Sequence, residues 1–252
     1  MKAHHPLGID IGGSGIKGAP VDLETGRFAA DRLRIETPQK STPEAVAEVV
    51  GRIADHFAKE TGNSPVGVTV PAVVARGLVR TAANIDPSWV GSDAAALLTA
   101  TLGRPVTVVN DADAAGVGEL HYGAARSTPG LVVLATLGTG IGSALLNNGE
   151  LIPNSELGHL LIDGVDAEKR ASSHARESED LSWEQWADRL QTHFAHVEDL
   201  LWPDLLVVGG GVSKHADRYL PLLHLRAPIV AAELGNAAGI VGAAWLAANA
   251  HT

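Results

Sequence analysis

The sequence predicts an α/β protein made of two similar halves, each with a mixed sheet. The first observation is a repeat: Gly13-Ser14-Gly15-Ile16 recurs as Gly138-Thr139-Gly140-Ile141 about half a chain later. The second is that each copy lies between two apolar, strand-like runs, the second of which leads into a turn. The third is that short β-branched runs alternate with segments of helical periodicity over the rest of the chain. The matching order of elements indicates a duplicated half.

Apolar runs bounded by turn residues predict the strands of the first half. A helix is expected to begin at Thr42 and Pro43, a cap residue and a first-turn proline, and apolar residues then recur at helical spacing until Gly62. The other expected elements are strands over residues 7–11, 16–21, 66–70 and 106–109, a turn at 23–26 and a helix over 112–123.

The second half is expected to begin with a strand over residues 131–137, and Asn148-Gly149 predicts a hairpin after the next apolar run. A long amphipathic helix follows, whose apolar stripe fits either core packing or a dimer interface. The stripe consists of Trp183, Trp186, Leu190, Phe194, Val197 and Leu201. A strand over 205–208 and an alanine-rich helix over 237–249 come last. We expect this helix to return to the first domain, so the predicted domains are residues 1–111 plus 237–252 and residues 112–236.

Composition narrows the possible classes of function. The chain has 252 residues and a formal net charge of −10, which disfavours non-specific binding to nucleic acid. It contains no cysteine, so disulfides, thiolate zinc sites and cysteine nucleophiles are excluded. Its first residues lack the apolar run of a signal peptide, and no stretch of about 18 apolar residues is present, so a cytoplasmic protein without a membrane span is expected.

The segment Asp10-Ile11-Gly12-Gly13-Ser14-Gly15-Ile16-Lys17-Gly18 is a candidate phosphate loop. Glycines let backbone N–H groups approach phosphate oxygens, and Lys17 adds positive charge. The spacing also fits a dinucleotide fingerprint, but that motif needs a helix next, whereas residues 16–21 continue as a strand. A tight hairpin without a ligand is the other alternative. Asp10 at the end of a strand and the second copy at 138–140 argue against it.

Two polar clusters are further candidates. Asn110-Asp111-Ala112-Asp113 lies between an expected strand and an expected helix, where Asn and Asp are favoured caps, and we expect Asp113 to serve as such a cap. Asp111 is placed instead for a general base that accepts a hydroxyl proton. In Glu156-Leu157-Gly158-His159, Glu156 and His159 offer hydrogen bonds to adjacent sugar hydroxyls, although a plain helix start explains this segment equally well.

Taken together, these segments resemble the ROK (repressor, open reading frame, kinase) family of sugar kinases in the hexokinase and actin superfamily, and in particular its polyphosphate glucokinase branch. The resemblance covers nearly the whole chain. It implies an actin-like, hexokinase-type (ribonuclease H-like) fold of two domains with an interdomain cleft. It assigns donor phosphate binding to Asp10, Gly12, Gly13, Ser14, Gly15, Lys17, Gly138, Thr139, Gly140, Gly210 and Gly211, and sugar binding to Asn84, Asn110, Asp111, Glu156 and His159.

The resemblance implies a homodimeric glucokinase that transfers a phosphoryl group from inorganic polyphosphate, and from ATP as well, to the 6-hydroxyl of glucose. Asp111 would act as the base, and Asp10 would position Mg²⁺ directly or through water. The alternatives are a strictly ATP-dependent hexokinase or glucomannokinase of the same family, a non-catalytic sugar-binding regulator and a nicotinamide-dependent oxidoreductase.

The chain departs from many ROK members after Glu-x-Gly-His, where they carry a cysteine-rich zinc segment. Residues 166–181 are polar and cysteine-free here, so no structural zinc is expected. A polyphosphate donor needs a cationic track because it has no base or ribose to recognise. The candidates are Lys17, Lys169, Arg170 and Arg176, although a solvated loop of mixed charge is the favoured explanation of the last three.

Overall fold

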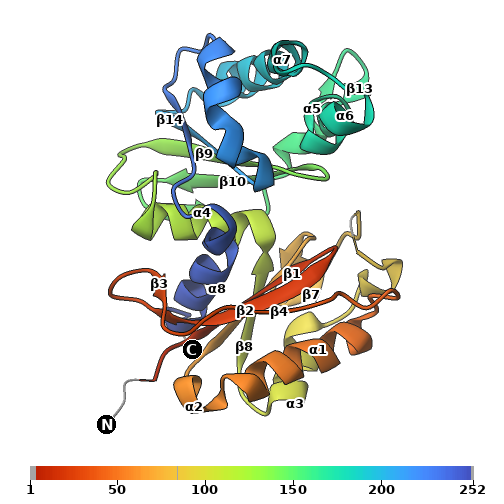
Figure 1. Cartoon of the computed structure of the whole chain (residues 1–252), viewed down its shortest axis with the longest axis vertical. Coiled ribbons are helices and arrows are strands. Elements are labelled where there is room, and N and C mark those ends of the chain that lie inside the picture. The colour runs from red at the N-terminus through yellow and green to blue at the C-terminus, as the bar shows by residue number, and fades with distance from the viewer. Residues whose placement is uncertain (1–3, 84, 251–252) are drawn as a thin grey trace. The chain divides into compact units, whose positions relative to one another are not determined.

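The computed structural model describes residues 4–83 and 85–250, which form two compact units (Figure 1). The first unit runs up to Gly118 and resumes at Ala237, and the second covers Glu119–Asn236. Helix α4 (Asp111–Tyr122) contains the point where the chain passes from the first unit to the second. None of the helices in the described part of the chain combines the length and apolar character that crossing a membrane requires.

The sheet of the first unit has a hairpin at one side and parallel strands at the other. Strand β1 pairs antiparallel with β2 and parallel with β5, and β5 pairs parallel with β8. The parallel strands therefore end at the same edge, where ligands bind in open α/β sheets. The strand order is β3 (Arg27–Phe28), β2 (Gly15–Asp22), β1 (Leu7–Gly12), β5 (Val66–Val70) and β8 (Val106–Asn110), with β4 (Leu33–Ile35) also paired to β2.

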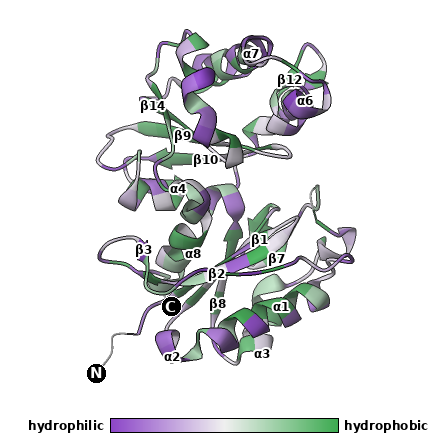
Figure 2. Ribbon diagram, in the orientation of Figure 1, coloured by the Kyte–Doolittle hydropathy of each residue, from purple (hydrophilic) through white to green (hydrophobic). Residues whose placement is uncertain are grey.

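Helices cover both faces of this sheet, with α1 (Pro43–His56) and α3 (Ala94–Leu102) on one face and α8 (Ala238–Ala248) on the other (Figure 1). Helix α8 is apolar along its length (Figure 2) and lies directly on β1 and β5. A Cβ atom at Gly8 or Gly67 would meet a carbonyl oxygen of α8 at 1.9 Å. Glycine at these two positions therefore permits the close packing of helix on sheet.

Helix α1 begins as expected, because Thr42 accepts a hydrogen bond from the Ala45 amide at 3.4 Å and Pro43 opens the helix. It ends earlier than its apolar spacing indicates. The buried Phe57 leaves the helical conformation, and the short α2 (Ala58–Thr61) continues to Gly62, which has a φ of 50°. The remaining elements before α4 are β6 (Val74–Ala75), β7 (Leu78–Val79) and the 3₁₀ helix η1 (Pro87–Trp89).

The second unit repeats the strand order of the first. Its sheet runs β11 (Glu150–Ile152), β10 (Ile141–Asn147), β9 (Leu131–Leu137), β14 (Leu205–Gly209) and β15 (Ile229–Ala231). Strands β9 and β10 form an antiparallel hairpin, whereas β9, β14 and β15 are parallel. Asn148 and Gly149 both have positive φ, as the predicted hairpin turn after β10 requires. The duplication predicted from the glycine repeat is thus confirmed by the topology of the two sheets.

Helix α7 (Trp183–Leu201) supplies the core of the second unit. Ser182 and Gln185 form a capping box at its start, which fixes where the helix begins. Trp186, Leu190 and Phe194 are at most 1% exposed. The apolar stripe is therefore core packing, as the first of its two interpretations predicted, and little of it is left for a dimer interface. The smaller elements are β12 (Leu161–Ile162), β13 (Val165–Asp166), α5 (Ala167–Ala171), α6 (Ser173–Ser178), η2 (Leu157–His159), η3 (Gly211–Arg218), η4 (Leu220–Leu222) and η5 (Gly235–Ala237).

Candidate active site

The site residues predicted from the sequence are divided between the two units. Asn84 lies outside the described residues. The first unit holds Asp10, Gly12, Gly13, Ser14, Gly15, Lys17, Asn110 and Asp111, and the second holds Gly138, Thr139, Gly140, Glu156, His159, Gly210 and Gly211. Each set is described within its own unit.

The first glycine loop is the two-residue connection of the β1–β2 hairpin, because Gly12 pairs with Gly15. No atom lies within 4 Å of the place a Cβ of Gly13 would occupy, so the backbone there is open to a ligand. Two carbonyls of the loop accept hydrogen bonds from protein donors: Thr37 Oγ1 donates to Gly12 at 2.5 Å, and Arg34 Nη2 donates to Ser14 at 2.6 Å. These bonds reduce the negative potential that a phosphate would meet at the loop.

Asp10 lies near the end of β1, and its carboxylate is held from both neighbouring strands. Thr69 of β5 donates its hydroxyl proton to Oδ1 at 2.8 Å, and Lys17 Nζ of β2 lies 3.8 Å from Oδ2. Both partners are opposite Asp10 in the strand register. The side chain of Asp10 remains 23% exposed, so the carboxylate is fixed in direction while still reachable by a ligand.

Arg34 and Thr69 are site residues that sequence reasoning missed. A Cβ atom at Gly15 would lie 2.6 Å from Arg34 Nε, so this guanidinium lies directly beside the first loop. Arg34 is opposite Lys17 in the β2–β4 register, which places two cations at the same loop. The sequence contains a turn at 23–26 that returns the chain toward β2, and this was the available signal for β4.

Asn110 caps helix α4, and Asp113 does not. The side chain of Asn110 is 7% exposed, and its Oδ1 accepts the amides of Ala112 at 2.8 Å and Asp113 at 3.0 Å. Its Nδ2 donates to the Ala72 carbonyl at 3.1 Å. The expectation that Asp113 is the cap was wrong because the helix begins at Asp111, which puts Asp113 inside the first turn.

Asp10 and Asp111 lie at the same edge of the first sheet. Asp10 is opposite Thr69, and Thr69 is opposite Val109, so Asp10 and Val109 are separated by two strand spacings. Since neighbouring strands lie about 4.8 Å apart, this separation is about 10 Å. Asp111 follows two residues later, at the start of α4. Two carboxylates thus lie at the carboxyl ends of parallel strands, where a ligand is expected.

The second glycine loop, Gly138–Gly140, connects β9 to β10 and is supported from outside the hairpin. The Gly138 amide donates to the Gly140 carbonyl at 3.0 Å, and the His174 amide of α6 donates to the Gly138 carbonyl at 3.1 Å. A Cβ of Gly138 would have no neighbour within 4 Å. Gly210 packs against the base of this loop, with a φ of 85° and room for no side chain, because a Cβ would lie 2.3 Å from the Leu137 carbonyl oxygen.

The Glu156–His159 segment is tied to the strand that leaves the second loop. Ser143 of β10 accepts the Leu157 amide at 2.9 Å, and a Cβ at Gly158 would lie 2.0 Å from the Ile141 carbonyl oxygen. The glycine of the motif is therefore required by close packing. The side chains of Glu156 and His159 remain 37% and 43% exposed, with 3.8 Å between Oε2 and Nε2.

Asp166 and Glu168 connect His159 to the start of β10. Asp166 Oδ2 lies 2.9 Å from His159 Nδ1, while its Oδ1 accepts the Glu168 amide at 3.1 Å and caps α5. Glu168 Oε2 accepts the Ile141 amide at 3.1 Å. The hydrogen bond to Asp166 raises the pKa of His159 above its ordinary value. Burial raises the pKa of Glu156, and the nearby His159 opposes this rise.

His159, Asp166 and Glu168 place ligand atoms within 4.8 Å of one another, a spacing that a metal ion could use. The hydrogen bonds among these groups account for their positions, and exposed acidic groups are common without a metal.

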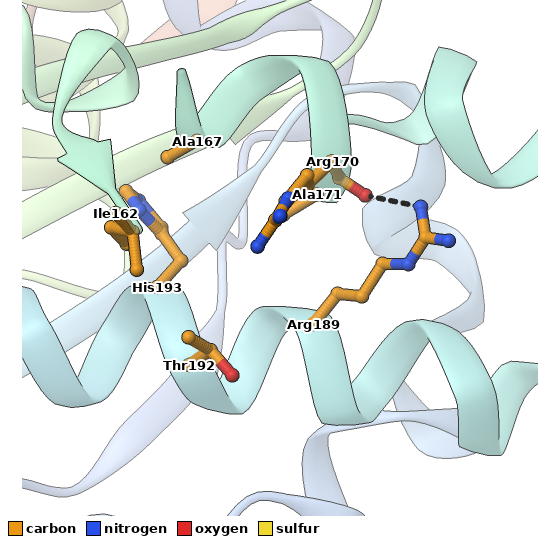
Figure 3. Close-up of a pocket in the computed structure, with 7 residues that line it drawn as sticks. All are labelled: Ile162, Ala167, Arg170, Ala171, Arg189, Thr192 and His193. Atoms are coloured by element: carbon orange, nitrogen blue, oxygen red, sulfur yellow. Dashed lines mark hydrogen bonds between the residues drawn. The ribbon is translucent and has the colours of Figure 1, made fainter. Parts of the chain in front are cut away.

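The candidate cations of the polyphosphate track each have different surroundings. Figure 3 shows Arg170 lining a pocket between α5 and α7 together with Arg189 and His193. Burial lowers the pKa of His193 to about 4, and Arg189 is paired with Glu179 at 2.6 Å. Glu168 lies at the second glycine loop. Arg170 is two residues further along the same helix, so its side chain points to a different side from that of Glu168. Lys17 lies beside Asp10, Lys169 is exposed, and Arg176 lies over Trp183.

Comparisons with known proteins give one consistent answer. A model of the ROK family matches residues 6–172. The chain is 51% identical over 241 residues to the polyphosphate glucokinase of Mycobacterium tuberculosis (strain CDC 1551 / Oshkosh), covering 95% of this chain and 90% of that protein.

Solved structures agree with this. The inorganic polyphosphate/ATP-glucomannokinase of Arthrobacter sp. strain KM matches with a TM-score of 0.95 and 54% identity over 99% of this chain and 100% of that one. A ROK family glucokinase from Streptomyces griseus, in complex with glucose and AMPPNP, matches with a TM-score of 0.81 and 25% identity over 96% of this chain and 98% of that one. The predicted actin-like α/β fold is thereby confirmed.

Proposed function

The chain belongs to the ROK family, and we propose that it is a glucokinase that transfers a phosphoryl group from inorganic polyphosphate to the 6-hydroxyl of glucose. The observation that carries this proposal is the 51% identity to a polyphosphate glucokinase over 95% of the chain. It is accompanied by two glycine loops, open at Gly13 and Gly138, and by carboxylates at positions 10 and 111. A non-catalytic regulator would have no need of this combination.

Asp111 acts as the general base in this proposal. Its position at the carboxyl end of β8 supports the role, because a carboxylate there accepts the proton of the attacking hydroxyl. Its Oδ1 accepts the Ala112 amide at 2.9 Å, which fixes the side chain at the start of α4. The carboxylate is thus oriented before the substrate arrives.

Donor phosphates are bound by the backbone amides of Gly12–Gly15 and Gly138–Gly140 and by the Gly210–Gly211 turn. Lys17 and Arg34 add positive charge at the first loop, where the overall charge of −10 would otherwise repel a polyanion. At Gly13 and Gly138, where a Cβ would have no neighbour within 4 Å, a phosphate oxygen can approach the backbone without meeting a side chain.

Asp10 fits a role in holding Mg²⁺. Magnesium is bound in kinases by one or two carboxylates together with substrate phosphates and water. Asp10 has one oxygen fixed by Thr69, a second oxygen 3.8 Å from Lys17, and a partly exposed side chain, all next to the first glycine loop. When bound, Mg²⁺ would neutralise charge on the donor phosphates.

The sugar is bound by Asn110, Glu156 and His159, with Asn84 as a further candidate. Glu156 accepts hydrogen bonds from hydroxyls, and His159 donates or accepts at Nε2 because Nδ1 faces Asp166. Asn110 uses its Oδ1 to cap α4, so its remaining Nδ2 proton is the group available to a hydroxyl. A homodimer is expected from the family.

ATP is a second candidate donor, favoured by the 54% identity to an enzyme described as a polyphosphate/ATP-glucomannokinase. Formation of glucose 6-phosphate should be measured separately with long-chain polyphosphate and with ATP, with glucose and mannose as acceptors. We expect transfer from polyphosphate to glucose at a rate at least equal to that from ATP. Transfer from ATP alone would overturn the donor assignment, and transfer from neither would overturn the kinase itself.

A further inference from the structure

Two arginines of the second unit converge on a single tryptophan. The Cζ atom of Arg176, on α6, lies 3.8 Å from the centre of the Trp183 ring, and that of Arg218, at the end of η3, lies 5.8 Å from the same ring. We call Arg176, Arg218 and Trp183 the paired-arginine site. Two positive charges over one ring favour an anion beside them, because its attraction to both offsets their mutual repulsion.

No carboxylate neutralises this pair in the described part of the chain, where neither guanidinium has a carboxylate oxygen within 4 Å. Other arginines of the unit do have such partners. Arg189 is 2.6 Å from Glu179, and Arg226, which also lies over a tryptophan, is 4.0 Å from Glu198. The Nε atom of Arg176 is buried without a hydrogen-bond acceptor. The paired-arginine site thus has unsatisfied positive charge in a protein whose net charge is −10.

Both segments that carry these arginines start close to the second glycine loop. The His174 amide donates to the Gly138 carbonyl, and Arg176 follows two residues later on α6. Helix η3 begins at Gly211, immediately after the glycine that packs on Leu137, and ends at Arg218. The two segments that carry the arginines therefore start close to the loop that is proposed to bind the donor.

The aromatic surroundings hold the arginines in place. The Trp183 ring is 5.9 Å from each of Trp186 and Tyr219, the latter at an interplanar angle of 12°, and 5.6 Å from His215. Trp186 and Tyr219 are fully buried, so the ring has little freedom to move. A guanidinium stacked on a fixed ring loses little freedom when it binds an anion.

We propose that the paired-arginine site binds phosphates of the polyphosphate chain beyond the one that is transferred. This inference rests on the proposed function and extends it, because it names the surface that holds the rest of the donor. Phosphate oxygens would accept charge-assisted hydrogen bonds from both guanidiniums. The ligand class is a linear inorganic polyphosphate, which a positively charged surface suits and which has no base to recognise.

The test compares Arg176→Gln, Arg218→Gln and the double variant with wild type, using long-chain polyphosphate, tripolyphosphate and ATP as donors. We expect the KM for long-chain polyphosphate to rise about tenfold in each single variant and further in the double variant. The KM for tripolyphosphate and ATP should change by less than about threefold, since these donors end close to the transferred phosphate. The KM for glucose should stay constant.

Arg226→Gln is the matched control, because it also removes an arginine stacked on a tryptophan, but one that already has a carboxylate partner. It should leave the KM for every donor unchanged. Arg176→Lys retains the charge and should recover most of the affinity, which separates loss of charge from loss of packing. Thermal unfolding of each variant identifies any that fail to fold.

Three results would overturn the inference: an unchanged KM for long-chain polyphosphate in the folded double variant, an equal rise with ATP, or an equal rise in Arg226→Gln. Calorimetric titration with long-chain polyphosphate in the absence of glucose keeps the test separate from catalysis. If wild type bound the polymer and the double variant did not, the paired-arginine site would be supported as a polyphosphate-binding site, even if no phosphoryl transfer from polyphosphate were found. Such an outcome would contradict the proposed function alone.

Discussion

The Nδ1 atom of His159 lies 2.9 Å from Oδ2 of Asp166. This contact joins the predicted sugar-binding segment to helix α5, which lies beside the second glycine loop. Asp166 also caps α5, which places Glu168 on the Ile141 amide. Since the donor at this contact is the Nδ1 proton, Nε2 is left for a ligand and faces Glu156. One carboxylate therefore orients the histidine and anchors the segment beside the loop.

Asp166→Asn should lower the pKa of His159, because the hydrogen bond to Asp166 is the main cause of its rise. In wild type this bond stabilises the fold fully below the ordinary histidine pKa of 6.5, and the stabilisation is lost as pH rises through the higher folded value. The difference in unfolding free energy between wild type and variant should therefore be larger at pH 6 than at pH 9. NMR titration of His159 and denaturant unfolding at both pH values measure this.

The exposed Asp188→Asn on α7 is the control for the same charge change, and it should leave the titration of His159 unaltered. We also expect Asp166→Asn to raise the KM for glucose about threefold to tenfold, because the His159 ring is no longer held in the orientation that binds the sugar. An unchanged pKa of His159 in the variant would contradict this role of Asp166.

Asp111→Asn should reduce kcat by about 10²-fold to 10⁴-fold, the range typical of a general base. The amide oxygen of asparagine still accepts the Ala112 amide, so the start of α4 is preserved and glucose should bind as before. Steady-state rates with both donors and calorimetric titration of glucose test the two parts separately. A variant that retained more than about a tenth of the wild-type rate would remove Asp111 from the role of base.

Glu156 gives a prediction about acidic pH. Burial raises its pKa above the ordinary value of 4.5, so it takes up a proton at a higher pH than an exposed glutamate. A protonated Glu156 accepts fewer hydrogen bonds from sugar hydroxyls, and the KM for glucose should rise on acidification before exposed carboxylates titrate. Glu156→Gln should bind glucose more weakly than wild type, and its KM for glucose should depend less on pH. An identical pH dependence in wild type and variant would show that another group controls sugar binding.

Local signals in the sequence predicted much of the fold. Thr42 and Pro43 marked the start of α1, and Asn148-Gly149 marked a hairpin, because caps and turns depend on neighbouring residues. The glycine repeat predicted the duplicated strand order, because each copy lies between two apolar, strand-like runs.

The contacts that orient the site were not predictable in this way. Thr69 reaches Asp10, and Arg34 reaches Ser14, through strand register, which pairs residues far apart in the chain. Arg176 and Arg218 are far apart in the chain, yet both lie over the Trp183 ring. The error about Asp113 is a local one: helix α4 begins at Asp111, so its cap is Asn110 and Asp113 lies in the first turn.

Gly210→Ala and Gly211→Ala form a matched pair that tests the support of the second loop. Gly210 has a φ of 85°, and a Cβ would lie 2.3 Å from the Leu137 carbonyl oxygen, so alanine there must displace backbone. We expect its free energy of unfolding to fall by about 2 kcal/mol or more, together with a higher KM for the phosphate donor. A Cβ at Gly211 would have no neighbour within 4 Å, so Gly211→Ala should unfold like wild type. Denaturant unfolding compares the two, and equal stability of both variants would mean that the Gly210 contact does not hold the loop.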